Sequence, residues 1–160
     1  IVFTSDHGYH LGEHTFWQKS NLHEEVLRVP LLISLPGGKA GRSRSLVELV
    51  DLFPTLSRLA GLQAPKGLHG TSLLPILRDP AARVKESALS IHGSGTSMRT
   101  ANWTYSRYKD GSEELYDMKN DPGQFTNRAG EADFIGSLAR HRTAFEKRLG
   151  ASGLKPGKVR

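Results

Sequence analysis

The chain has 160 residues, of which 37% are hydrophobic and 24% charged, a composition typical of a soluble globular protein rather than a disordered one. It contains no cysteine, which excludes disulfides and thiolate metal sites within these residues. The longest apolar run, residues 29–35, is far shorter than the ~20 residues that cross a bilayer, so we expect no membrane span.

The formal net charge is +6 and the isoelectric point is near 9.8. A basic surface can attract nucleic acid, anionic lipid or an anionic substrate. The basic residues are spread along the chain and are not interleaved with aromatic residues, and no nucleic-acid-binding motif is present. We therefore expect a solvated basic surface and no nucleic-acid partner.

The first part of the chain alternates strand and helix signals. Residues 1–4 are β-branched and aromatic, which predicts a strand, and residues 8–19 lack a clear period, which predicts a loop. Asn21, with Glu24 three residues later, predicts a capped helix that runs to about residue 28. A second strand is expected at residues 31–35. Continuous apolar strands are typical of an α/β sheet that is covered on both faces.

A second helix is expected at residues 52–60, with Asp51 as its N-cap. Pro54 lies in the first turn, where no intrahelical donor is needed, and Gly61 ends the helix as a C-terminal glycine. A short helical turn follows around residues 73–77.

Beyond residue 79 the pattern changes to short alternating segments, typical of half-buried strands. These strands are expected at residues 88–91, 97–100, 103–108 and 114–117. Apolar residues at helical spacing then predict a final amphipathic helix over residues 131–148. The sequence therefore predicts an α/β part at residues 1–78, a small antiparallel sheet with a closing helix at residues 79–150, and a flexible tail at residues 151–160.

Asp6 and His7 follow the first strand, at the edge where α/β proteins bind ligands. Gly8 allows a sharp turn, which could direct both side chains toward one point. A carboxylate oxygen and a neutral imidazole nitrogen are both metal ligands. The two residues alone indicate either a metal site or an ordinary turn.

The surrounding residues resemble the sulfatase family of the alkaline-phosphatase superfamily, and within it the branch of iduronate-2-sulfatase and choline sulfatase. The similarity covers most of the chain, in the order that the family has. The segments that carry it are SDHGYHLGEH at residues 5–14, WQK at 17–19, RVPLLI at 28–33, LVDLFPTL at 49–56, GLHGTSLLP at 67–75 and ELYDM at 114–118.

The resemblance implies the C-terminal part of an alkaline-phosphatase-like sulfatase fold and hydrolysis of sulfate esters, with sulfated sugars as the expected substrates. Asp6 and His7 match the late metal ligands of the family, whose ion is usually calcium. Because calcium prefers oxygen ligands, the nitrogen of His7 leaves manganese and magnesium open. Lys19 matches the lysine that contacts the substrate sulfate, where a compact ammonium stabilises charge on the leaving oxygen.

The family's nucleophile is a formylglycine made within a Cys/Ser-x-Pro-x-Arg motif, and these 160 residues contain no such motif. We therefore expect a C-terminal fragment that needs the N-terminal half of the same protein as its partner and is inactive alone. The resemblance also implies export to the periplasm or the exterior.

Other polar residues lie in or near the same loop. His10 and His14 flank the loop and are expected either to contact the substrate or to bind backbone groups. Glu13 is expected to brace the loop, and Trp17 to pack or to form a pocket wall. The remaining histidines have no companions at ligand spacing and are expected to be structural: His23, His69, His92 and His141.

Two alternatives to a sulfatase stay open. A phosphodiesterase or phosphonate monoester hydrolase of the same superfamily would use the same half-site. A non-catalytic relative that binds polyanions would use only the basic surface.

Overall fold

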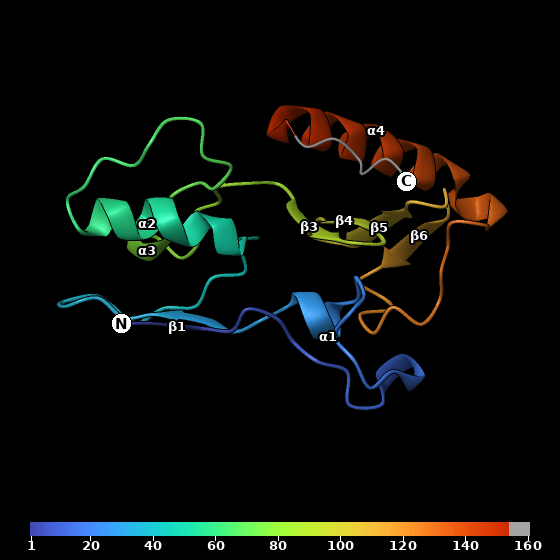
Figure 1. Ribbon diagram of the computed structural model, residues 1–160, viewed down its shortest axis with the longest axis horizontal. Helices are drawn as coiled ribbons and strands as arrows, with labels where there is room; N and C mark the ends of the chain where they lie inside the picture. Colours follow the sequence, from blue (N-terminus) through green and yellow to red (C-terminus); the bar gives the residue numbers. More distant parts are fainter. Residues whose placement is uncertain (154–160) are drawn as a thin grey trace. The chain divides into compact units, whose positions relative to one another are not determined.

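The computed structural model describes residues 1–153 (Figure 1). Contacts group the chain into two units: one contains Ile1 and Ser34–Ala88, and the other contains Val2–Ile33 and the residues from Leu89 onward. The predicted boundary near residue 78 stays a prediction. Most of the expected tail lies outside the described residues, but its first two residues continue a helix that ends at Ser152.

The second unit is built on a four-stranded antiparallel sheet with the strand order β3-β4-β5-β6. The strands are β3 Ala88–His92, β4 Gly95–Arg99, β5 Trp103–Tyr108 and β6 Glu113–Asp117. Each strand pairs with the one before it in sequence, and Asp110-Gly111 lies in the last hairpin, where Gly111 has a φ of 88°. The four strand predictions are confirmed, with bounds that differ from the expected ones by at most two residues.

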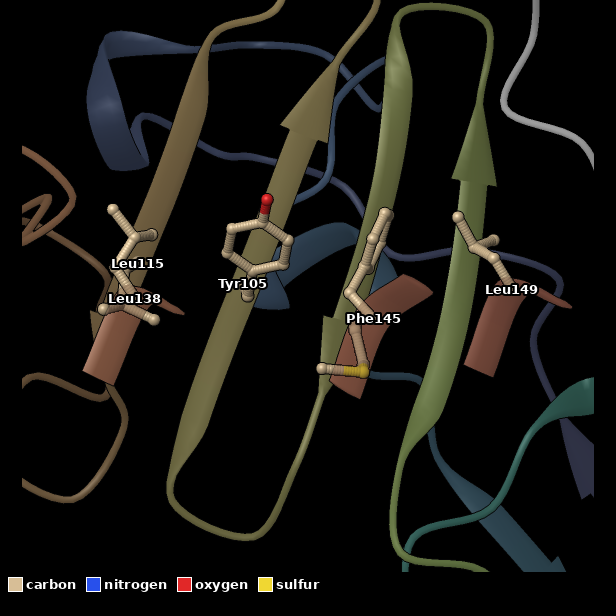
Figure 2. Packing of buried hydrophobic residues seen from close by; sticks show 6 residues of the cluster. Tyr105, Leu115, Leu138, Phe145 and Leu149 are labelled. Atoms are coloured by element: carbon tan, nitrogen blue, oxygen red, sulfur yellow. The ribbon is translucent and has the colours of Figure 1, made fainter. Parts of the chain in front are cut away.

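A long helix, α4 Ile135–Ser152, packs on this sheet and follows a short 3-10 turn, η3 Ala132–Phe134. The buried core consists of three residues from the strands and three from the helix: Met98, Tyr105, Leu115, Leu138, Phe145 and Leu149. Figure 2 shows these side chains gathered in one layer between sheet and helix. The rings of Tyr105 and Phe145 meet edge to face at 5.1 Å between centroids. Each fully buried large side chain contributes about 1.5–3 kcal/mol to folding.

The same unit contains the antiparallel pair of β1 Val2–Thr4 and β2 Leu31–Ile33. Phe3 and Leu32 pair across this ladder, yet they are 61% and 59% exposed. The expected cover on both faces is therefore not supplied by residues 1–153. The exposed side chains make one face of this two-stranded ribbon apolar.

Helix α1 Glu24–Leu27 begins later than the sequence predicts, and its N-cap is His23, not Asn21. The side chain of Asn21 bonds the ring of His10 and the backbone N–H of His23 instead. The carboxylate of Glu24 accepts a hydrogen bond from Arg99 at 2.9 Å. The expected capping box is thus wrong, because Asn21 bonds His10 and the backbone of His23, and Glu24 bonds Arg99.

The first unit contains η2 Leu49–Asp51, α2 Leu52–Leu59 and α3 Leu74–Arg78. Asp51 is the N-cap residue of α2, as predicted, but its backbone angles are helical and its side chain makes no cap hydrogen bond to this helix. Its buried carboxylate accepts hydrogen bonds from the backbone of Glu48 and Thr71, both at 2.7 Å. Gly61 ends α2 with a φ of 71°, as predicted. Within residues 1–153, no helix has both the length and the hydropathy that a bilayer span requires.

Candidate functional site

The loop after β1 lies against α1 at Gly8. The backbone N–H of Gly8 donates to the carbonyl oxygen of Val26 at 2.8 Å. A Cβ atom at this position would lie 1.9 Å from the carbonyl oxygen of Glu25, closer than any non-bonded contact allows. Glycine is therefore required for the close approach that fixes the two residues before it.

Asp6, His7 and Lys19 lie together beside this contact. The ammonium nitrogen of Lys19 is 2.7 Å from Nε2 of His7, and Oδ2 of Asp6 is 3.6 Å from the same nitrogen. Nδ1 of His7 lies 2.8 Å from the carbonyl oxygen of Gly8. A carbonyl only accepts hydrogen bonds, so Nδ1 carries the ring proton and Nε2 presents its lone pair toward Asp6 and Lys19.

Backbone hydrogen bonds across the loop bring Lys19 close to His7. The N–H of His10 donates to the carbonyl of Gln18, and the N–H of Gly12 donates to that of Phe16, both at 3.0 Å. Between them lies a 3-10 turn, η1 Glu13–Thr15. The loop is therefore a closed, hydrogen-bonded structure with Asp6 and His7 at one end and Lys19 at the other.

Glu13 braces the tip of the loop, as the sequence indicates. Its carboxylate accepts a hydrogen bond from the backbone N–H of Leu11 at 2.6 Å. This hydrogen bond lowers the pKa of the exposed carboxyl of Glu13. Trp17 is 69% exposed, so residues 1–153 do not provide the packing expected for it.

His10 and His14 turn toward the interior of the unit. His10 has no exposed surface, and its Nε2 is 2.7 Å from the amide nitrogen of Asn21. The ring of His14 stacks on Phe125 at 4.9 Å between centroids, with its side chain 12% exposed. A contact of either histidine with a substrate stays a prediction, and both buried positions weigh against it.

His23 lies beside these two histidines in the fold, although the sequence places no companion for it at ligand spacing. Its ring centroid lies 4.4 Å from that of His14 and 5.9 Å from that of His10. Burial, and after it the neighbouring His14, lowers the pKa of His23 to about 4, so the ring is neutral at pH 7. Glu25, on α1, faces the same group, with its Oε1 3.7 Å from Nε2 of His14.

This histidine cluster, defined as His10, His14, His23 and Glu25, has no signature in the sequence. The spacing between its members matches no ligand motif, because the loop must fold back on α1 before the rings meet. Composition gives the one indication: the three histidines and Glu25 occur within sixteen residues, which the sequence assigns partly to a loop and partly to a helix.

Comparison with known proteins matches residues 12–143 to the family described as N-sulphoglucosamine sulphohydrolase, C-terminal. Arylsulfatase K of Xenopus laevis is 35% identical over 149 residues, which cover 82% of this chain and 28% of the relative. A protein named sulfatase from Formosa agariphila is 32% identical over 136 residues, covering 84% of this chain and 27% of that protein. The chain thus spans less than a third of the length of these relatives.

Two solved structures share the fold. The structure of BT4656 in complex with its substrate D-glucosamine-2-N,6-O-disulfate superposes with a TM-score of 0.87 at 28% identity, covering 96% of this chain and 34% of that one. A phosphonate monoester hydrolase from Silicibacter pomeroyi gives a TM-score of 0.85 at 26% identity, covering 95% of this chain and 35% of that one.

These similarities confirm the α/β fold class with its small antiparallel sheet and C-terminal helix, and they confirm the resemblance found in the loop and strand motifs. The family match extends over most of the chain, from the tip of the loop that ends at Lys19 into α4. The chain belongs to the sulfatases, in the family of their C-terminal domains described as N-sulphoglucosamine sulphohydrolase, C-terminal.

Proposed function

We propose that the full-length protein is a metal-dependent sulfatase that hydrolyses sulfate esters of sugars, with Asp6 and His7 as metal ligands and Lys19 bound to the substrate sulfate. One observation carries this proposal: the carboxylate of Asp6, the lone pair on Nε2 of His7 and the ammonium of Lys19 lie together at a strand end. This group offers one oxygen and one nitrogen to a cation, with a positive charge beside them.

The residues present fit a divalent cation. The hydrogen bond from Nδ1 to Gly8 orients the ring of His7 and leaves Nε2 free of a proton, as metal-bound histidines require. Calcium is the ion we propose, and the nitrogen ligand of His7 leaves manganese and magnesium as alternatives. When bound, such an ion supplies positive charge to the sulfate oxygens.

Lys19 can hold the sulfate once Nε2 of His7 binds a metal. In the described structure its ammonium faces that lone pair at 2.7 Å. A cation and an ammonium cannot share one lone pair, so metal binding would release the N–H groups of Lys19 for an anion. There the ammonium would stabilise the negative charge that develops on the leaving oxygen.

The nucleophile would be a formylglycine from a part of the protein other than these 160 residues, which contain no Cys/Ser-x-Pro-x-Arg motif. The sugar substrate is proposed from BT4656, whose structure holds D-glucosamine-2-N,6-O-disulfate as its substrate. Export from the cytoplasm belongs to the same proposal and rests on the family resemblance.

A second candidate is hydrolysis of phosphonate or phosphate esters. The similarity to a phosphonate monoester hydrolase, with a TM-score of 0.85, favours it, because the fold alone does not separate the two activities. A non-catalytic, polyanion-binding protein would have no need of an oriented histidine beside Asp6 and Lys19.

The test compares the full-length protein with its Asp6→Ala and Lys19→Ala variants on a sulfated glucosamine and on a phosphonate monoester. We expect sulfate-ester turnover that falls at least about a hundredfold in both variants. His92→Gln, in an exposed hairpin, is the control. Faster turnover of the phosphonate than of the sulfate ester would favour the second candidate function. Full activity of Asp6→Ala would refute the proposed metal site.

A further inference from the structure

The histidine cluster contains four buried polar atoms that have no hydrogen-bond partner among residues 1–153. They are Nδ1 of His10, Nε2 of His14, Nδ1 of His23 and Oε2 of Glu25. Buried polar groups without partners are rare, because each costs the free energy of its lost hydration. Four of them in one group of contacting side chains indicate that something other than these residues satisfies them.

We propose that the histidine cluster is a structural zinc site, separate in its residues from Asp6, His7 and Lys19. Ligand atoms from His10, His23 and Glu25 all lie within 4.8 Å of one another. Zinc holds nitrogen and oxygen at about 2.0–2.2 Å in a tetrahedron, so these atoms need to move by only about 1 Å. His14 supplies the fourth ligand, since its Nε2 is 3.7 Å from Glu25.

The chemistry of the ligands suits zinc better than calcium. Three imidazole nitrogens and one carboxylate oxygen form a donor set that calcium, which prefers six to eight oxygens, does not favour. The rings of His10 and His23 are buried, and an imidazole binds a metal through the lone pair of a ring nitrogen. The single carboxylate of Glu25 would reduce the charge of the bound ion.

The backbone of His14 adopts an uncommon conformation. Its φ of 53° lies in the left-handed region, which is uncommon for residues other than glycine. This conformation places its ring against that of His23 and within reach of Glu25. Strain of this kind persists where the surrounding structure requires one orientation of a side chain.

Asn21 shows what zinc binding would change. Its amide nitrogen faces Nε2 of His10 at 2.7 Å, and its oxygen accepts from the N–H of His23 at 3.1 Å. If His10 binds zinc through Nδ1, its proton moves to Nε2, and Asn21 must present its oxygen there. An aspartate at this position would have an oxygen for both partners, as in the carboxylate–histidine–zinc arrangement.

The site would fix the loop of residues 8–19 to α1, because His10 and His14 belong to the loop, His23 caps the helix and Glu25 lies within it. The ion would thereby stabilise the position of Lys19 without contacting the substrate. Nε2 of His23 lies 4.0 Å from the carboxylate of Glu114, which would support this ligand from β6.

The first experiment measures zinc by elemental analysis in the full-length protein after chelation and reconstitution with zinc. The Asp6→Ala variant, which lacks the proposed catalytic ligand, serves as the background. We expect one zinc ion per chain in Asp6→Ala and a loss of that ion in Asp6→Ala/His23→Gln. The control Asp6→Ala/His92→Gln should keep it, since His92 lies in an exposed hairpin. Equal zinc in all three variants overturns the proposal.

The second experiment remains decisive if His23→Gln does not fold. Cobalt replaces zinc, and its visible absorption reports tetrahedral coordination. In Asp6→Ala/Asn21→Asp we expect cobalt to bind roughly tenfold more tightly than in Asp6→Ala, with a larger metal-induced rise in melting temperature. Without a zinc site, Asn21→Asp only buries a charge and removes a donor from His10. Weaker or unchanged cobalt binding therefore refutes the site.

Discussion

The ammonium nitrogen of Lys85 lies 2.7 Å from the carboxylate of Asp51, a side chain that has no exposed surface. Lys85 also contacts the carboxylate of Glu48, and its own side chain is only 9% exposed. One buried cation therefore compensates two buried carboxylates. We expect Lys85→Met to lower the free energy of unfolding of the full-length protein by about 3–5 kcal/mol, the cost of an unpaired buried charge.

Urea denaturation measures this change. Lys66→Met, outside the described network, is the matched control and should change the stability by less than about 0.5 kcal/mol. A Lys85→Met variant as stable as the control would show that the two carboxylates are not held by this ammonium.

Gly8→Ala tests the contact between the loop and α1. The new Cβ would lie 1.9 Å from the carbonyl oxygen of Glu25, so the loop has to move away from the helix. We expect a loss of stability of about 1–3 kcal/mol, together with reduced turnover, because Asp6 and His7 move with the loop. Gly130→Ala, where a Cβ meets no atom within 4 Å, should leave both quantities nearly unchanged. Equal effects of the two substitutions would contradict the close approach at Gly8.

His7→Asn tests the proposed metal ligand by exchanging its nitrogen for an amide oxygen. Calcium favours oxygen more strongly than manganese does, so the ratio of turnover with calcium to turnover with manganese should rise by roughly tenfold. The measurement is a titration of the chelated full-length protein with each ion. If the ratio of turnover with calcium to turnover with manganese stays constant, His7 is not a metal ligand.

The pair of Glu113 and Arg142 makes stability depend on pH. The hydrogen bond from Arg142 lowers the pKa of the Glu113 carboxyl below its usual 4.5 in the folded protein, while the side chain of Glu113 is 16% exposed. A lowered folded pKa means that this contribution is present above pH 4.5 and is lost as the pH falls through the folded value.

Glu113→Gln should therefore flatten the decline of the unfolding free energy below pH 4.5. The slope changes by at most ~1.4 kcal/mol per pH unit, the value for one proton. The unchanged protein, measured in the same buffers, provides the comparison. The same slope in Glu113→Gln would mean that Arg142 does not hold this carboxylate.

Local pattern was enough to predict the strands and the final helix, since alternation, turn glycines and helical spacing act over few residues. The predictions failed where a polar side chain finds its partner far along the chain. Asp51 precedes α2 as predicted, but its carboxylate bonds Lys85, thirty-four residues away, and local pattern does not reveal such a partner. The carboxylate of Glu24 likewise accepts a hydrogen bond from Arg99 and does not form the expected capping box.

The candidate active site could be proposed from sequence because Asp6, His7 and Lys19 belong to one loop whose motifs resemble the sulfatase family. The histidine cluster could not be found in this way. His10 and His23 come together only because the loop folds back on α1. The sequence has no periodic pattern from which this contact could be predicted.

The strand order β3-β4-β5-β6 has a consequence for how the chain folds. Each strand pairs with its sequence neighbour, so this sheet can assemble from successive hairpins with little loss of chain entropy. The segment before it is attached through long-range contacts: Arg99 reaches Glu24 across 75 residues, and Gln124 reaches the same residue across 100. We therefore expect the sheet to form first and to act as a template, with the segment that carries Asp6, His7 and Lys19 ordered last.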